Sequence, residues 1–184
     1  MRLSSIYRVW QRNWLHFKKS WLVNFILIVI EPLFFLVALG YGLGSYVRNI
    51  GGVSFVEFYF PGLLCNTAVM VAFFETTYVS FSKLTFQRTY FTLLQSPIEP
   101  DEIAMADILW GATKGFLSAV GISIIASLFG QVHSIMIVPA LLVVFILAFL
   151  FSALGMIITS TVKNSDGIIY SASGFIIPMS LFSG

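Results

Sequence analysis

The chain has 184 residues, of which 58% are hydrophobic and only 10% are charged, and its formal net charge is +2. An ordinary soluble domain is about one quarter charged, so a soluble protein of this composition would expose apolar surface and aggregate. A single cysteine excludes an intrachain disulfide framework, and His16 and His133 are too far apart in sequence to suggest a metal cluster. No Gly-rich phosphate loop of the G-x-x-x-x-G-K-[ST] type occurs in the sequence. We therefore expect no metal, no cofactor and no nucleic-acid partner for this chain.

Residues 3–20 are predicted to form an amphipathic helix that lies in the membrane interface. Aromatic side chains recur at steps of three and four, which places them on one helical face: Tyr7, Trp10, Trp14, Phe17 and Trp21. Basic side chains lie on the opposite face: Arg8, Arg12 and Lys19. The aromatic face, with Trp10 and Trp14, would meet acyl chains, and the basic face, with Arg8 and Arg12, would meet anionic head groups. A cytoplasmic helix packed against another domain is the alternative.

Five apolar segments are predicted to cross the membrane, since roughly 20 apolar residues span a bilayer as a helix. They are residues 21–40, 58–81, 108–129, 135–159 and 167–182. With the N-terminus in the cytoplasm, Arg48 is the only cation assigned to an outer segment, as the positive-inside rule favours. A cleaved signal peptide is the alternative for the first run, but its apolar stretch would be only about 7–15 residues long. The sequence thus predicts an all-α polytopic membrane protein, with residues 1–184 in one domain.

Residues 82–107 form the longest polar stretch and are predicted to be an inner loop. Phe81, Leu84, Phe91 and Leu94 fit one helical stripe that Arg88 interrupts. Pro97 ends this pattern, because the residue before a proline avoids the helical region. A second helix is predicted to begin at Pro100, where Asp101 and Glu102 suit the positive end of the helix dipole. A short helix held rigidly on two spans could transmit motion from a soluble partner, and a loop that only reverses the chain is the alternative.

Three ionisable residues, Glu31, Glu75 and Lys114, fall within the apolar runs. Such a group at mid-membrane costs about 2.5–3.5 kcal/mol on insertion scales, so it usually faces protein or water. Glu31 and Glu75 are therefore candidates for lining a translocation path. The alternatives are that Glu31 caps a proline-broken helix, that Glu75 pairs with a neighbouring helix, and that Lys114 extends to the inner head groups. Gly111 and Gly115 form a small-xxx-small pair that is predicted to let two helices approach closely.

The order and spacing of several short motifs resemble the membrane permeases of ABC-2 type exporters. They are Glu31-Pro32-Leu33-Phe34-Phe35-Leu36, Leu39-Gly40-Tyr41-Gly42-Leu43-Gly44, Tyr59-Phe60-Pro61-Gly62-Leu63-Leu64, Phe74-Glu75-Thr76-Thr77-Tyr78, Leu94-Gln95-Ser96-Pro97-Ile98 with Glu102-Ile103, and Asp107-Ile108-Leu109-Trp110-Gly111-Ala112-Thr113-Lys114-Gly115. The fourth and the last resemble the branch that includes the lipo-oligosaccharide (nodulation-factor) exporter permease and many drug-export permeases.

This resemblance implies a non-enzymatic subunit of the bacterial plasma membrane that exports an amphipathic substrate, such as a lipid-linked glycan, a lipo-oligosaccharide or a drug. It implies a partner ATPase that binds ATP and magnesium, and a second permease subunit. The segment between spans 2 and 3 would dock on the ATPase through Leu94, Gln95, Ser96, Pro97, Ile98, Glu99 and Glu102. Such permeases usually have six spans, so the chain is expected to be truncated before the sixth. A truncated subunit that does not transport, and a secondary transporter or channel, are the alternatives.

Overall fold

The computed structural model describes residues 2–35, 37–38, 42, 44, 46, 49–50, 52–128 and 137–182, and these are almost entirely helical. Two two-residue strands pair as an antiparallel hairpin, with Asn49 opposite Ser54. The elements in chain order are α1 (Leu3–Lys19), α2 (Trp21–Phe35), β1 (Asn49–Ile50), β2 (Val53–Ser54), α3 (Phe55–Phe74), the π-helical η2 (Glu75–Val79), α4 (Ser80–Thr85), α5 (Thr89–Leu94), α6 (Pro100–Leu128), α7 (Ile137–Thr161), α8 (Ser165–Ser171), the π-helical η3 (Ala172–Ile176) and α9 (Ile177–Phe182). The predicted all-α membrane fold is confirmed.

Three helices in the described part of the chain are long and apolar enough to cross a membrane. They are Phe55–Thr85, which joins α3, η2 and α4, then Pro100–Ser127 and Ile137–Thr161. They correspond to the predicted spans 2, 3 and 4. Residues 21–35 of the predicted span 1 form α2, and residues 36, 39 and 40 of that span lie outside the described residues. The predicted span 5 lies within α8 to α9, and neither segment is among these three. The number of five spans therefore stays a prediction.

Local signals set the starts of two helices: α3 begins earlier than predicted, and α6 begins at Pro100 as predicted. α3 begins at Phe55, three residues before the predicted start, because Ser54 and Glu57 form a reciprocal capping box. α6 begins at Pro100, so residues 100–107 of the predicted inner loop are the first two turns of a continuous 29-residue helix. Proline is favoured at the first helical position, and no further proline interrupts α6 before Leu128.

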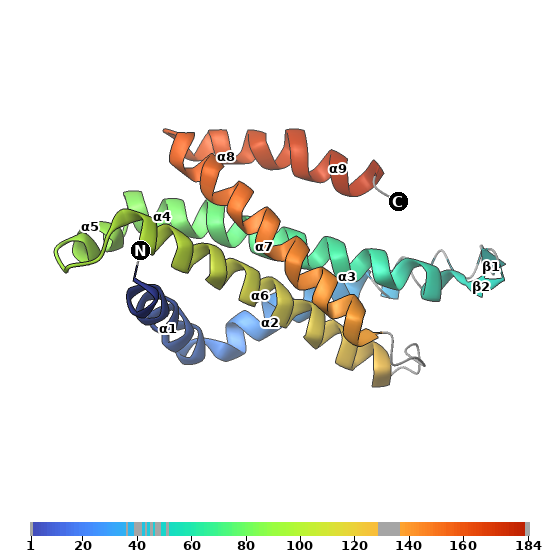
Figure 1. Ribbon diagram of the computed structural model, residues 1–184. Coiled ribbons are helices and arrows are strands. Elements are labelled where there is room, and N and C mark those ends of the chain that lie inside the picture. Colours follow the sequence, from blue (N-terminus) through green and yellow to red (C-terminus); the bar gives the residue numbers. More distant parts are fainter. Residues whose placement is uncertain are drawn as a thin grey trace.

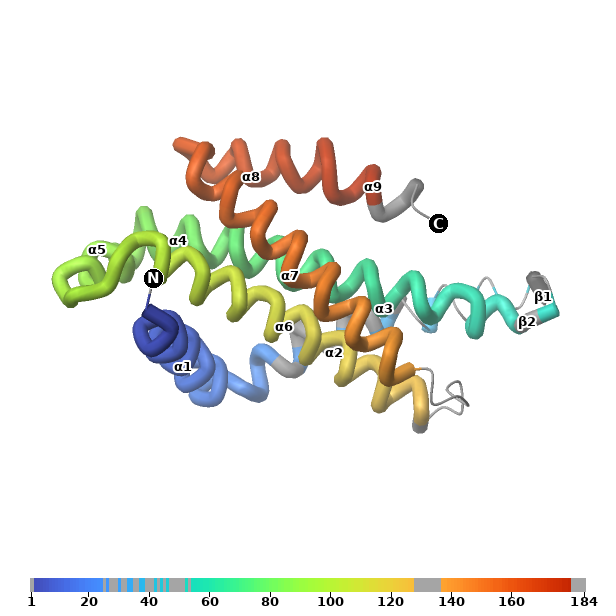
Figure 2. The backbone as a smooth tube through the Cα atoms, viewed as in Figure 1, coloured from blue at the N-terminus to red at the C-terminus, as the bar shows by residue number. Residues whose placement is uncertain are grey.

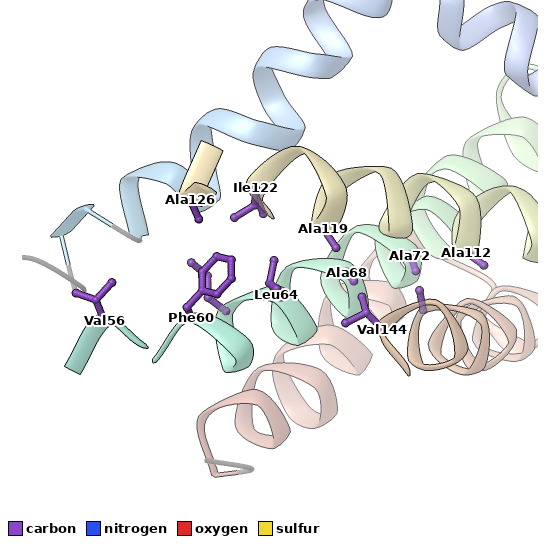
Figure 3. Close-up of a cluster of buried hydrophobic side chains, with 12 residues drawn as sticks. Val56, Phe60, Leu64, Ala68, Ala72, Ala112, Ala119, Ile122, Ala126 and Val144 are labelled. Atoms are coloured by element: carbon purple, nitrogen blue, oxygen red, sulfur yellow. The ribbon is translucent and has the colours of Figure 1, made fainter. Parts of the chain in front are cut away.

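The long helices α3, α6 and α7 lie side by side and enclose the main core (Figure 1). α1 packs across the beginning of α6, and the helix from α8 to α9 returns from the end of α7 on the opposite side of the bundle in this view. The N-terminus lies beside the turn between α5 and α6 (Figure 2). Larger side chains of α3, such as Phe60 and Leu64, point toward Ile122 of α6 (Figure 3).

Small residues let these helices approach closely. A Cβ atom added at Gly115 would lie 2.6 Å from the carbonyl oxygen of Ala68, and one added at Gly111 would lie 2.5 Å from Ser152 Oγ. The predicted role of the Gly111–Gly115 pair is therefore confirmed. Lipid is as apolar as the helices themselves, so association depends on this close packing and on polar contacts between helices.

Hydroxyl groups of α7 donate hydrogen bonds to main-chain carbonyls of α6 and η2. Ser152 Oγ donates to Ile108 O of α6 at 2.7 Å, and Thr159 Oγ1 donates to Thr76 O of η2 at 2.7 Å. η2 is a single wide turn between α3 and α4, and such π-helical turns recur at functional sites. Its first residue is Glu75, whose side chain is buried.

Candidate functional site

The chain reverses sharply between α4 and α6. α4 ends at Thr85, and Arg88 adopts the left-handed conformation with φ +50°, so α4 and α5 are separate helices. The predicted helical stripe from Phe81 to Leu94 therefore does not lie on one helix. A non-glycine residue in this conformation breaks the helical hydrogen-bond pattern. α5 is followed by a turn at residues 95–99, as the break before Pro97 predicts.

Most of the predicted coupling residues are exposed at this turn. Leu94 is 44% exposed, Ile98 is half-buried, and the remaining exposed members are Gln95, Ser96, Pro97 and Glu99. The inner side of the turn packs on the bundle: Leu93 and Ile98 contact a buried cluster formed by Ile6 and Val9 of α1 and Ala106 of α6. The turn is thus exposed on one side and supported by α1 and α6 on the other. We call residues 94–99 the coupling turn.

Glu102 differs from the other predicted coupling residues because its side chain is only 1% exposed. Its carboxylate accepts hydrogen bonds from the main-chain N–H of Arg2, at the start of α1, and from that of Glu99 at 3.3 Å. Glu102 therefore joins the beginning of α1 to the beginning of α6 and supports the coupling turn from inside the protein.

Asp107, which is 1% exposed, connects four helices. Its Oδ1 accepts from Asn13 Nδ2 of α1 at 2.6 Å and pairs with Lys83 Nζ of α4 at 3.0 Å, and its Oδ2 accepts from the Tyr90 hydroxyl of α5. Burial, and next the adjacent Asp107 carboxylate, raise the pKa of Tyr90, so this hydroxyl keeps its proton and donates. The sequence pattern did not indicate this cluster, because Lys83 and Asp107 both fall in the predicted inner loop.

A second buried ion pair lies deeper in the bundle. Glu75 of η2 is 7% exposed; its Oε2 is 2.6 Å from Lys114 Nζ, and its Oε1 accepts from Trp110 Nε1 at 2.8 Å. Glu75 thus pairs with a neighbouring helix, which was one of the two predicted alternatives, and Lys114 is its ion-pair partner. A role of Glu75 in a translocation path stays a prediction. Glu31 lies in α2, but its side chain is outside the described part of the structure.

The aromatic face of α1 packs on α6. The rings of Trp10, Trp14 and Phe17 lie 6.3, 6.2 and 5.7 Å from that of Trp110, all edge to face. Trp10 Nε1 also donates to Thr113 Oγ1 of α6 at 3.2 Å. Both tryptophans are half-buried, so part of the predicted lipid-facing stripe is covered by protein. The periodicity identified this face, but it could not distinguish lipid from a neighbouring helix.

The predicted basic face of α1 is less uniform than the sequence suggests. Arg8 is exposed, whereas Arg12 is half-buried and its Nη2 donates to Asn13 Oδ1 at 3.2 Å. The contact of Arg8 with head groups stays a prediction, and Arg12 borders the cluster around Asp107 through Asn13.

A pocket of about 240 Å³ lies between these polar clusters. Its walls come from α1, the α1–α2 junction, α2, η2, α4 and α6, and its polar lining includes Asn13, Ser20, Asn24, Glu75, Lys83 and Lys114. We call it the inner pocket. No group of three or more His, Cys, Asp or Glu side chains that could hold a metal ion occurs among the described residues.

Comparison with known proteins places residues 4–184 in a match to the family described as ABC-2 type transporter. Nodulation protein J of Rhizobium leguminosarum bv. viciae is 34% identical over 176 residues, covering 96% of this chain and 68% of that protein. Nodulation protein J of Rhizobium meliloti (strain 1021) is 32% identical, with coverages of 96% and 67%. Inner membrane transport permease YadH of Escherichia coli (strain K12) is 25% identical over 178 residues, with coverages of 96% and 68%. No solved structure matches the chain.

Proposed function

Because this chain belongs to the ABC-2 type transporter family and is a membrane-embedded permease of an ABC exporter, we propose that it moves an amphipathic substrate outward with ATP hydrolysed by a separate ATPase. The substrate class is a lipid-linked glycan, a lipo-oligosaccharide or a drug. The similarity to Nodulation protein J and to YadH supports this choice. In this proposal ATP and magnesium bind to the ATPase, and two permease subunits form the transporter. The protein lies in the bacterial inner membrane with its N-terminus in the cytoplasm.

The observation that carries this proposal is the coupling turn, which is exposed on one face and fixed to the bundle on the other. Leu94, Gln95, Ser96 and Pro97 are exposed, so a soluble partner can contact them. Glu102 and Asp107 fix the base of the same turn to α1, α4 and α6 through hydrogen bonds and an ion pair. A force applied to the turn would therefore reach these helices together.

The proposed mechanism is alternating access. ATP binding closes the paired ATPases and displaces the coupling turn, and α6 moves with the turn because both belong to one hydrogen-bonded unit. The interface between the two permease subunits then opens outward. Buried contacts have discrete arrangements, so a small displacement at one end produces a change between two states.

The test introduces a carboxylate on the exposed face of the coupling turn and measures ATP hydrolysis. Leu94→Glu is expected to reduce substrate-stimulated ATP hydrolysis by the assembled transporter by about tenfold, because a buried charge in a docking contact costs at least about 1.4 kcal/mol. The matched control is Ser165→Glu, which adds the same charge at an exposed position in the first turn of α8, where a carboxylate is favourable. Equal activity of the Leu94→Glu and Ser165→Glu transporters would contradict docking at the coupling turn.

A further inference from the structure

Asn66 is exposed on the surface of α3, which belongs to a helix long and apolar enough to cross a membrane. At 1.5 Å per residue it lies about 12 Å from Phe58, where the predicted span begins, and a hydrocarbon core is about 30 Å thick. Leu64 and Ala68, two positions before and after it, point into the main core (Figure 3). Residues two positions apart do not share a helix face, so Asn66 faces away from this core.

The side chain of Asn66 makes no hydrogen bond with any described residue. The adjacent Thr67 satisfies its hydroxyl within α3 by donating to Leu63 O at 2.8 Å, whereas Asn66 makes no such bond. An amide side chain has two N–H donors and one carbonyl acceptor. Leaving these groups unpaired in hydrocarbon is costly, so polar side chains of membrane helices usually face protein or water. Asn66 therefore needs a partner from outside the described bundle.

The surface around Asn66 is apolar, which favours a protein partner over water. Of residues 58–77, all of which the structure describes, only Asn66 exposes a polar side chain. On the same side of α3, Phe58 is 57% exposed and Met70 is half-buried. A water-filled path needs polar groups along its length, and this surface has one amide. Gly62, one turn before Asn66, is also exposed, and a residue without a side chain lets a second helix approach closely.

We propose that Asn66 joins two copies of this chain, with Gly62 at the point of closest approach. In a twofold-symmetric contact the same residues face each other. Asn66 Nδ2 of each copy then donates to Asn66 Oδ1 of the other, so an identical amide supplies both the donor and the acceptor that Asn66 lacks. Small residues and amide side chains are common contacts between membrane helices. This inference rests on the two-subunit transporter proposed above, and it assigns the subunit contact to α3.

The test is oxidative cross-linking of the full chain in membranes, in a Cys65→Ala background that removes the native thiol. Asn66→Cys is expected to give a disulfide-linked dimer, because two cysteines can be bridged when their Cα atoms are within about 7 Å. The matched control is Leu142→Cys, at a 62% exposed position of α7, which should stay monomeric. Equal dimer yields at the two positions would show random collision and would overturn the proposal.

A second measurement follows dimerisation of the otherwise unchanged chain by energy transfer between two labelled pools in detergent micelles. Asn66→Leu is expected to weaken dimerisation about sevenfold, because two hydrogen bonds of average strength between membrane helices are lost. Asn66→Gln keeps the amide group and is expected to retain more of the affinity than Asn66→Leu. An unchanged affinity in Asn66→Leu would contradict the proposed contact.

Two further results would argue against the proposal. Labelling of Asn66→Cys by a membrane-impermeant maleimide, in the same Cys65→Ala background, would show that this position borders water. Dimers that form without a cross-link at position 66 would place the subunit contact elsewhere and leave the proposed export function intact. A chain that stays monomeric would contradict both this contact and the two-subunit transporter. All readouts measure association, so they are independent of export and of any ATPase.

Discussion

Gly115→Ala is expected to destabilise the protein, although alanine is the better helix former. The added Cβ would lie 2.6 Å from Ala68 O and 3.2 Å from Ala148 Cβ. The distance to the carbonyl oxygen is about 0.8 Å shorter than an ordinary van der Waals contact. That oxygen belongs to the backbone of α3, so relief requires the two helices to separate. Overpacking of this kind costs about 1–3 kcal/mol, against a gain of about 1 kcal/mol in helix propensity. We expect a net loss of up to about 2 kcal/mol in the free energy of unfolding.

The assay is reversible unfolding of the purified protein in mixed micelles, followed by circular dichroism. The matched control is Gly174→Ala in η3, where an added Cβ meets no atom within 4 Å. This control should equal or exceed the wild-type stability, because only the propensity gain remains there. If Gly115→Ala were as stable as Gly174→Ala, close approach of α3 and α6 would not limit stability, and the packing argument would be refuted.

Two further variants test the buried polar contacts. Lys114→Gln leaves the Glu75 carboxylate without its ion-pair partner and is expected to lower the free energy of unfolding by about 3–5 kcal/mol. Adding Glu75→Gln to this variant should recover most of that loss in the same unfolding assay. If the double variant recovered nothing, the two side chains would act independently. Thr159→Val removes the hydrogen bond to Thr76 O and is expected to cost about 0.6–1.7 kcal/mol, which is the interval from the average to the largest value for hydrogen bonds between membrane helices. The control Thr161→Val, at the exposed end of α7, should cost less, and an equal cost would argue against the bond from α7 to η2.

The helical elements and their approximate places could be predicted from the sequence because they depend on local chemistry. Long apolar runs identified the three helices that are able to cross a membrane, and Pro100 marked the start of α6. The capping box of Ser54 and Glu57 was also present in the sequence, although the predicted start at Phe58 overlooked it. Such signals act over a few residues, so they do not require knowledge of the fold.

The partners of the buried charges depend on contacts between distant segments and could not be predicted. Glu75 and Lys114 are 39 residues apart and Asn13 and Asp107 are 94 apart, yet each pair is in direct contact. Neither the period of the pattern nor the residue types indicate which of several helices faces a given side chain. The same limit applies to Glu102, whose position suited a solvent-facing helix start but whose side chain is buried against Arg2.

By itself the sequence determined that this chain is a helical membrane protein, since apolar length, helix-breaking residues and the spacing of cations are properties of the chain. Only the tertiary structure decided that α1 packs its tryptophans on α6, that the coupling turn is fixed at its base by Glu102 and Asp107, and that two lysines border one pocket. The physical reason is that a buried charge or aromatic face needs a partner, but several helices satisfy that need equally well until packing selects one.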